Sequence, residues 1–139
     1  MMLTDLAEDD DLGIEARTST TIYVCITCRR TSDPEGVRPG LELADATVRA
    51  ARDTGIGVCK IRCLANCNRA LSAAMRRDGS WTYVFGDLDP ENSAAALIDG
   101  ARLLARSGDG LLPWRGRPDS LKRGLIARVP PMDFEEDVE

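Results

Sequence analysis

The sequence predicts an α/β fold: one β-sheet with flanking helices, the element order β-α-β-β-β-α, and a loop-rich C-terminal segment. A β-prone run and an alternating run enclose a segment of helical periodicity, which is typical of a strand, a crossover helix and a parallel strand. A strong hairpin signal and a second helical segment follow. At 139 residues the chain is long enough for one domain with its own core.

The first three elements are expected between residues 20 and 62. Residues 20–24 (TTIYV) are mostly β-branched or aromatic, which favours a strand. Residues 41–53 have helical spacing, and the expected apolar face consists of Leu41, Ala44, Val48 and Ala51. Residues 56–62 alternate as a half-buried strand does, and we expect Cys59 on this strand to be a small buried hydrophobe.

A hairpin is expected next. Residues 71–77 and 80–85 are β-prone, and Asp78-Gly79 between them favours a tight turn. The aromatic side chains that alternate on the second of these strands are expected in the core; they are Trp81, Tyr83 and Phe85.

The second helix is expected over 94–106, with Asn92 or Ser93 as its cap. The acidic residues just before it are expected to form a turn rather than a cation site; they are Asp87, Asp89 and Glu91. Residues 111–131 are expected to be mostly loops. The complete order is the arrangement of the thioredoxin-like fold.

Two acidic segments enclose a mildly basic body. Residues 1–15 contain six acidic residues and residues 133–139 contain five, and neither segment has a basic residue. Residues 16–132 therefore carry a net charge of about +6, although the whole chain carries −5. We expect both tails to be disordered, and a tail folded back onto the basic body is the alternative. The expected division is 1–18, 19–131 and 132–139.

Several classes of protein are excluded or disfavoured by composition. Histidine is absent, which excludes His-ligated zinc, haem bound through histidine, Rieske-type ligation and Ser-His or Cys-His catalysis. No apolar run is long enough to cross a bilayer, and residues 1–11 are acidic where a signal peptide would be basic. The basic residues are too few to predict nucleic-acid binding. We expect a cytoplasmic protein that binds neither membranes nor nucleic acid.

Four of the five cysteines form two closely spaced pairs. Cys25 and Cys28 make a C-x2-C pair, Cys63 and Cys67 make a C-x3-C pair, and each pair follows a predicted strand. Because the ends of parallel strands lie at the same edge of a sheet, the four thiolates are expected to converge there. In a cytosolic protein such clusters indicate metal or redox chemistry rather than structural disulfides.

Three kinds of chemistry compete for these cysteines. A structural zinc ion accepts four thiolates, although zinc knuckles usually have Gly or Pro in or after the turn, where this chain has Ile26-Thr27 and Arg29-Arg30. A dithiol oxidoreductase would use the C-x2-C pair alone and leave the second pair without a role. An iron–sulfur cluster uses all four.

Several motifs resemble those of a known family. They are YVCITCRR at 23–30, RCLANC at 62–67, WTYVFGDL at 81–88, GLLPWR at 110–115 and RGLIARVP at 123–130. They are similar to motifs of an uncharacterised bacterial metal-binding family, a domain of unknown function. That family is related to the thioredoxin-like [2Fe–2S] ferredoxins, which include a small electron-transfer subunit of respiratory complex I. The resemblance covers residues 20–131.

The resemblance implies an electron carrier with a [2Fe–2S] cluster on Cys25, Cys28, Cys63 and Cys67. It also implies a link to cobalamin biosynthesis, because family members often lie near those genes. The second cysteine pair matches the second ligand pair of the ferredoxins, whose two leading cysteines are more widely spaced than the C-x2-C pair here. A non-redox zinc or metal-carrier protein is the first alternative, and a dithiol oxidoreductase is the second. We expect an electron-transfer or metal-binding protein rather than a catalyst.

Basic residues near the cysteines would stabilise a reduced cluster and attract an acidic redox partner. They are Arg29, Arg30, Lys60, Arg62 and Arg69, and the alternative is that they are ordinary surface charges. A second candidate patch for anion or partner binding comprises 114–117 and Lys122-Arg123. The sequence does not decide the oligomeric state, for which a homodimer is one alternative.

Overall fold

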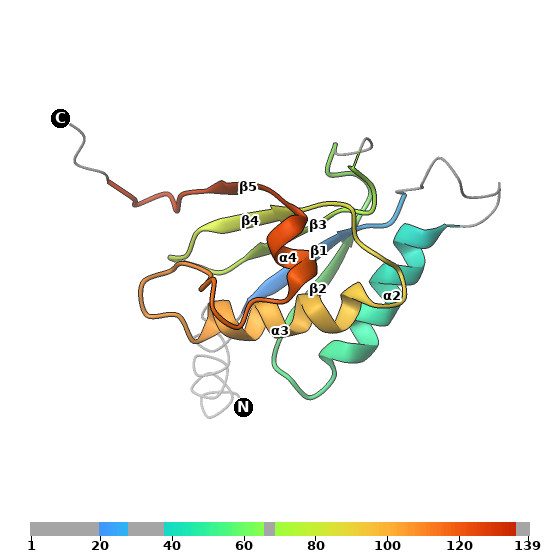
Figure 1. Ribbon diagram of the computed structural model, residues 1–139, viewed down its shortest axis with the longest axis horizontal. Helices are drawn as coiled ribbons and strands as arrows, with labels where there is room; N and C mark the ends of the chain where they lie inside the picture. The colour runs from blue at the N-terminus through green and yellow to red at the C-terminus, as the bar shows by residue number, and fades with distance from the viewer. Residues whose placement is uncertain (1–19, 28–37, 66–68, 136–139) are drawn as a thin grey trace, which may run out of the picture.

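The computed structural model describes residues 20–27, 38–65 and 69–135 (Figure 1). Its elements are β1 (Thr21–Cys25), α2 (Pro39–Ala51), β2 (Gly57–Ile61), β3 (Ala73–Arg76), β4 (Thr82–Phe85), α3 (Ser93–Ala105), α4 (Asp119–Arg123) and β5 (Leu125–Val129). The strands form one sheet in the order β2-β1-β3-β4-β5. β1 and β2 are parallel, and the other neighbours are antiparallel. The predicted α/β fold is confirmed.

The core lies between the sheet and its helices. On one face of the sheet, Ile22, Val24 and Phe85 are fully buried, and α2 and α3 pack against each other there. Tyr83 is also buried, so two of the three predicted core aromatics are confirmed, whereas Trp81 is only half-buried. The opposite face forms a groove of about 840 Å³ that strand and loop residues line, without a residue of the described helices. Among the described residues, no helix has the length and apolar content needed to span a membrane.

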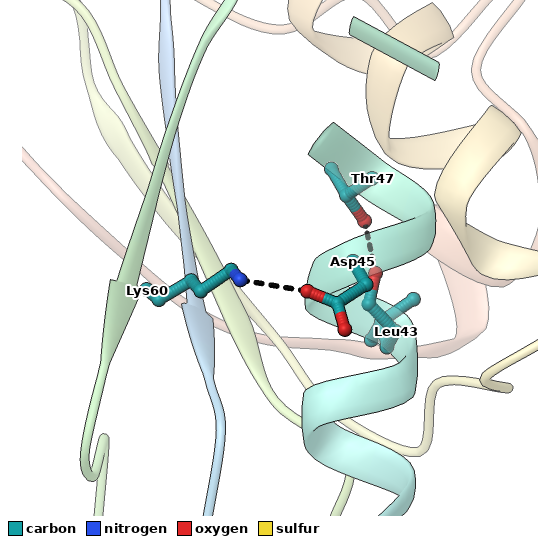
Figure 2. A network of polar contacts seen from close by, with 4 residues as sticks. All are labelled: Leu43, Asp45, Thr47 and Lys60. Carbon is teal, nitrogen blue, oxygen red and sulfur yellow. Dashed lines mark hydrogen bonds and ion pairs between the residues drawn. The ribbon is translucent and has the colours of Figure 1, made fainter. Parts of the chain in front are cut away.

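Helix α2 buries a face that overlaps the predicted one only in part, at Ala44 and Ala51. Its buried positions include Leu43, Ala44, Thr47 and Ala51, while Val48 is 37% exposed. The Thr47 hydroxyl donates to the Leu43 carbonyl at 2.7 Å, which allows a polar residue to lie in the core (Figure 2). Because this helix is rich in alanine, more than one set of apolar positions at helical spacing can be drawn on it. Periodicity therefore predicted where the helix lies in the sequence, but not which of its faces turns toward the core.

The C-terminal part of the domain departs from the prediction. Residues 111–131, expected to be mostly loops, contain both α4 and β5. β5 pairs with β4 at the sheet edge, with a register irregularity between Val84 and Phe85. α4 has only five residues, too few for a helical period to be visible in the sequence.

Asp89 caps the turn that leads into α3, and the side chain of Asn92 makes no capping hydrogen bond. Asp89 Oδ1 accepts the backbone N–H groups of Glu91 at 2.7 Å and of Asn92 at 3.2 Å. The Ser93 hydroxyl accepts the backbone N–H of Asp89 at 2.8 Å. The acidic residues before α3 therefore form a turn, as predicted, whereas capping by Asp89 was not predicted.

Asp89→Ala should lower the free energy of unfolding by about 1 kcal/mol, because two backbone N–H groups lose their acceptor. Urea denaturation followed by circular dichroism measures this change. The matched control is Glu91→Ala, which removes an exposed carboxylate two residues away and should change stability by less than about 0.5 kcal/mol. Equal losses in the two variants would show that charge near the helix, and not capping, is responsible.

Candidate metal centre

The carboxyl ends of β1 and β2 lie side by side at one end of the sheet. We call this end, where Cys25 and Cys63 lie, the cysteine edge. Cys25, the last residue of β1, is paired in register with Ile61, the last residue of β2. The backbone N–H of Ile26 continues this ladder by donating to the Ile61 carbonyl at 2.8 Å. Cys63 follows two residues after Ile61. The predicted meeting of the two strand ends is therefore confirmed.

Cys25 is buried at this end of the sheet and is held there by hydrogen bonds. Its side chain is 2% exposed, and its Sγ lies 3.2 Å from the carbonyl oxygen of Arg62, the residue before Cys63. Its backbone N–H donates to the Ser72 carbonyl at 3.1 Å. The Thr27 hydroxyl donates to the same Arg62 carbonyl, so the segment after β1 is tied to the segment after β2. The Cys25 thiol donates its proton to this carbonyl. Metal binding would remove that proton and so would replace this hydrogen bond.

Cys63 lies on the exposed side of this edge and accepts a backbone hydrogen bond. Its side chain is exposed, and its Sγ accepts the backbone N–H of Ala65 at 3.1 Å. Ala65 itself adopts a left-handed backbone conformation with φ of 63°. Hydrogen bonds to sulfur of this kind tune the reduction potential of metal–sulfur centres. No pattern in the sequence indicates this backbone donor.

The other two predicted ligands, Cys28 and Cys67, lie outside the described residues. Within the described ranges, no three or more Cys, Asp, Glu or His side chains form a group able to hold a metal ion. The structure thus places Cys25 and Cys63 at one edge, and the four-cysteine centre stays a prediction.

The prediction that Cys59 is buried was wrong, because its side chain is exposed. Cys59 lies on the edge strand β2, in register with Tyr23 of β1. Strand alternation shows which residues share a face, but not whether another layer covers that face. Cys59 lies four residues before Cys63 on the same stretch of chain.

Two of the basic residues near the cysteines are paired with carboxylates. Lys60 Nζ lies 2.6 Å from Asp45 Oδ1 of α2 (Figure 2), and an Arg69 guanidinium nitrogen lies 2.7 Å from Asp87 Oδ2. Arg62 is exposed and has no ion pair with any described residue. Arg29 and Arg30 lie outside the described residues. The positive charge at this edge is therefore partly offset by two acidic residues that the sequence did not connect with it.

A family model described as "Protein of unknown function (DUF1636)" matches residues 22–131. The chain belongs to the DUF1636 family. The match covers both cysteine pairs and the C-terminal α4–β5 segment. No curated protein matches the chain at a significant level.

Solved structures place the DUF1636 domain in the thioredoxin-like fold. It is similar to a thioredoxin-like [2Fe–2S] ferredoxin from Aquifex aeolicus, with a TM-score of 0.52 and 17% identity over 84% of this chain and 98% of the ferredoxin. A crystal structure of the wild-type thioredoxin-like [2Fe–2S] ferredoxin from the same organism gives a TM-score of 0.51 and 14% identity over 78% of this chain and 97% of the other. At these identities the similarity establishes the fold alone.

Proposed function

We propose that this DUF1636 protein is a ferredoxin-like electron carrier that holds a [2Fe–2S] cluster on Cys25, Cys28, Cys63 and Cys67. The observation that carries the proposal is the short distance between the two cysteine loops, with Cys25 Sγ 3.2 Å from the carbonyl of the residue before Cys63. The similar solved structures are described as [2Fe–2S] ferredoxins of the same fold. A cytoplasmic location and a link to cobalamin biosynthesis belong to this proposal, and they rest on the sequence and the family resemblance.

The residues at this edge fit an all-thiolate cluster. A bound [2Fe–2S] cluster supplies one-electron redox chemistry. Cys25 would anchor it against the buried side of the edge, and Cys63 would hold it on the exposed side. The Ala65 N–H donates to the Cys63 sulfur, and the exposed Arg62 adds positive charge nearby. Both features favour the more negative, reduced state.

Anaerobic purification followed by metal and sulfide analysis tests the proposal. We expect a brown protein with equal amounts of iron and acid-labile sulfide, with absorption across the visible range that bleaches on reduction. A colourless protein with one zinc ion and neither iron nor sulfide would contradict it and support the four-thiolate zinc alternative. A metal-free protein with a reversible Cys25–Cys28 disulfide would support the dithiol oxidoreductase.

Asp87→Asn should raise the reduction potential of the cluster. The substitution removes a negative charge and frees Arg69 from its ion pair, and both changes favour the reduced state. A redox titration followed by visible absorption measures the shift. Because the Arg69–Asp87 pair is about half-exposed, the free energy of unfolding should change by less than about 1 kcal/mol.

The matched control for this shift is Asp45→Asn, which frees Lys60 of β2 in the same way. Lys60 extends from the strand toward α2 (Figure 2), so we expect a smaller rise in potential from this variant. A lower potential in Asp87→Asn would contradict the electrostatic role given to Arg69.

A further inference from the structure

An exposed tryptophan with two cations on its ring lies on the helical side of the molecule. Trp114 is 62% exposed and belongs to the loop between α3 and α4. The Arg117 guanidinium carbon lies 5.1 Å from the centre of its six- and five-membered ring system, and Lys122 Nζ lies 4.8 Å from it. Cations over an aromatic face hold the ring in place without burying it.

The loop that carries Trp114 is fixed to the sheet. Arg117 is only 8% exposed, and its guanidinium donates to the carbonyls of Leu112 at 2.6 Å and Pro113 at 3.1 Å. The Leu112 N–H donates to the Tyr83 hydroxyl of β4 at 2.8 Å. A side chain that is already ordered loses little conformational entropy when it is bound. Exposed, rigid Trp and Arg residues are typical of the energetic centres of protein interfaces.

The segment around this tryptophan carries a net positive charge. Residues 111–124 contain four basic residues and one acidic residue. Arg115 and Arg123 are exposed, and neither they nor Lys122 form an ion pair with any described residue. This charge complements an acidic binding partner.

We propose that Trp114, Arg115, Lys122 and Arg123 form a docking surface for an acidic protein segment, which we call the Trp114 surface. That this partner is a redox protein rests on the proposed function, whereas the docking surface itself does not. Binding would join the carboxylates of the partner to the unpaired cations and would cover the exposed edge of the tryptophan.

The Trp114 surface extends toward the cysteine edge. α4 ends at Arg123, and the carbonyl of the next residue, Gly124, accepts the Gly86 N–H at 2.8 Å. The neighbouring Asp87 N–H donates to the Arg69 carbonyl at 2.8 Å. Arg69 follows two residues after Cys67. A partner that covers α4 would therefore reach the end of the sheet where Cys25 and Cys63 lie.

The two acidic segments of the chain, 1–15 and 133–139, connect to the sheet at the end opposite the cysteines. β1 begins at Thr21 opposite Arg76, and β5 ends at Val129 opposite Thr82, so both connections lie at the edge away from the cysteines. The start of the C-terminal acidic segment already has a contact, because the Phe134 ring meets the Trp81 ring edge-on at 5.1 Å. A separate acidic partner is thus favoured as the occupant of the Trp114 surface.

Fluorescence titration tests the docking surface. The chain has two tryptophans, so full-length protein with Trp81→Phe reports on Trp114 alone. The probe is a short poly-L-glutamate peptide at low ionic strength, with an uncharged Gly-Ser peptide of the same length as the control. We expect saturable, salt-sensitive quenching by poly-glutamate only, and an affinity about tenfold weaker after Lys122→Gln with Arg123→Gln.

The matched control variant is Arg49→Gln with Arg52→Gln, which removes the same charge from exposed positions at the end of α2. Its affinity should stay within about twofold of the parent protein. Equal weakening in both double variants, or no saturable quenching at all, would overturn the proposal. So would unchanged poly-glutamate binding by Trp114→Ala, measured by calorimetry.

A further full-length variant, with the six acidic residues of 1–15 changed to Asn and Gln, tests the N-terminal segment as occupant. If it binds poly-glutamate about tenfold more tightly and shifts the Trp114 emission without any probe, the occupant is this segment and a separate partner is ruled out. An unchanged affinity supports the partner. All these measurements are independent of metal content, so a failed iron assay would end the electron-carrier proposal and leave them standing.

Discussion

Cys63→Ala should remove the iron and the acid-labile sulfide from anaerobically purified protein, whereas Cys59→Ala should retain both. Cys63 lies at the edge where β1 and β2 end, and its sulfur accepts a backbone N–H. Cys59 is an equally matched control, because it is also exposed, belongs to the same stretch of chain and lies on β2 before the edge. Alanine is preferred to serine because it offers no oxygen ligand.

Iron, zinc and sulfide are measured per chain, and far-UV circular dichroism confirms that each variant is folded. Loss of the cluster from both variants would mean that Cys59 also contributes, and retention by Cys63→Ala would exclude Cys63 as a ligand. If the wild-type protein contains zinc instead, the same pair of variants reports whether zinc has the same ligand. Cys28→Ala then tests the remaining ligand of the first pair, because the two leading cysteines of the ferredoxins are more widely spaced than Cys25 and Cys28.

The part of the candidate site that follows from chain topology was predictable from sequence. A strand, a helix and a strand in this order form a parallel pair, so the residues after 24 and after 62 had to meet at one edge. The register of Cys25 with Ile61 realises that expectation. Charge pairing was not predictable in this way, because Asp45 and Asp87 approach Lys60 and Arg69 only after the fold brings distant segments together.

The features that the sequence did not reveal depend on neighbours far along the chain. Val48 is exposed and Leu43 is buried because α2 packs on both the sheet and α3, which periodicity within one helix does not show. Cys59 is exposed because its strand is at the sheet edge. β5 was missed because its five residues gain their strand character from pairing with β4.

Gly124→Ala should be the most destabilising of the point substitutions considered for this fold. A Cβ atom at this position would lie 2.5 Å from the Gly86 carbonyl oxygen and 2.6 Å from that of Ser120. Both obstacles are backbone atoms, so no side-chain rotation relieves the overlap. The chain must move at the point where α4 joins β5 and where Gly124 accepts the Gly86 N–H. We expect a loss of about 3 kcal/mol in the free energy of unfolding.

The matched control is Gly108→Ala, because a Cβ atom there would meet no atom within 4 Å, and its stability should change by less than about 0.5 kcal/mol. Urea denaturation of the two variants measures the difference. Gly86→Ala separates stability from metal binding, since its Cβ would lie 2.7 Å from the Arg69 carbonyl, two residues after Cys67. Without denaturant, it should retain less metal than Gly124→Ala. A Gly124→Ala protein as stable as Gly108→Ala would contradict the close backbone approach that joins α4 to the cysteine edge.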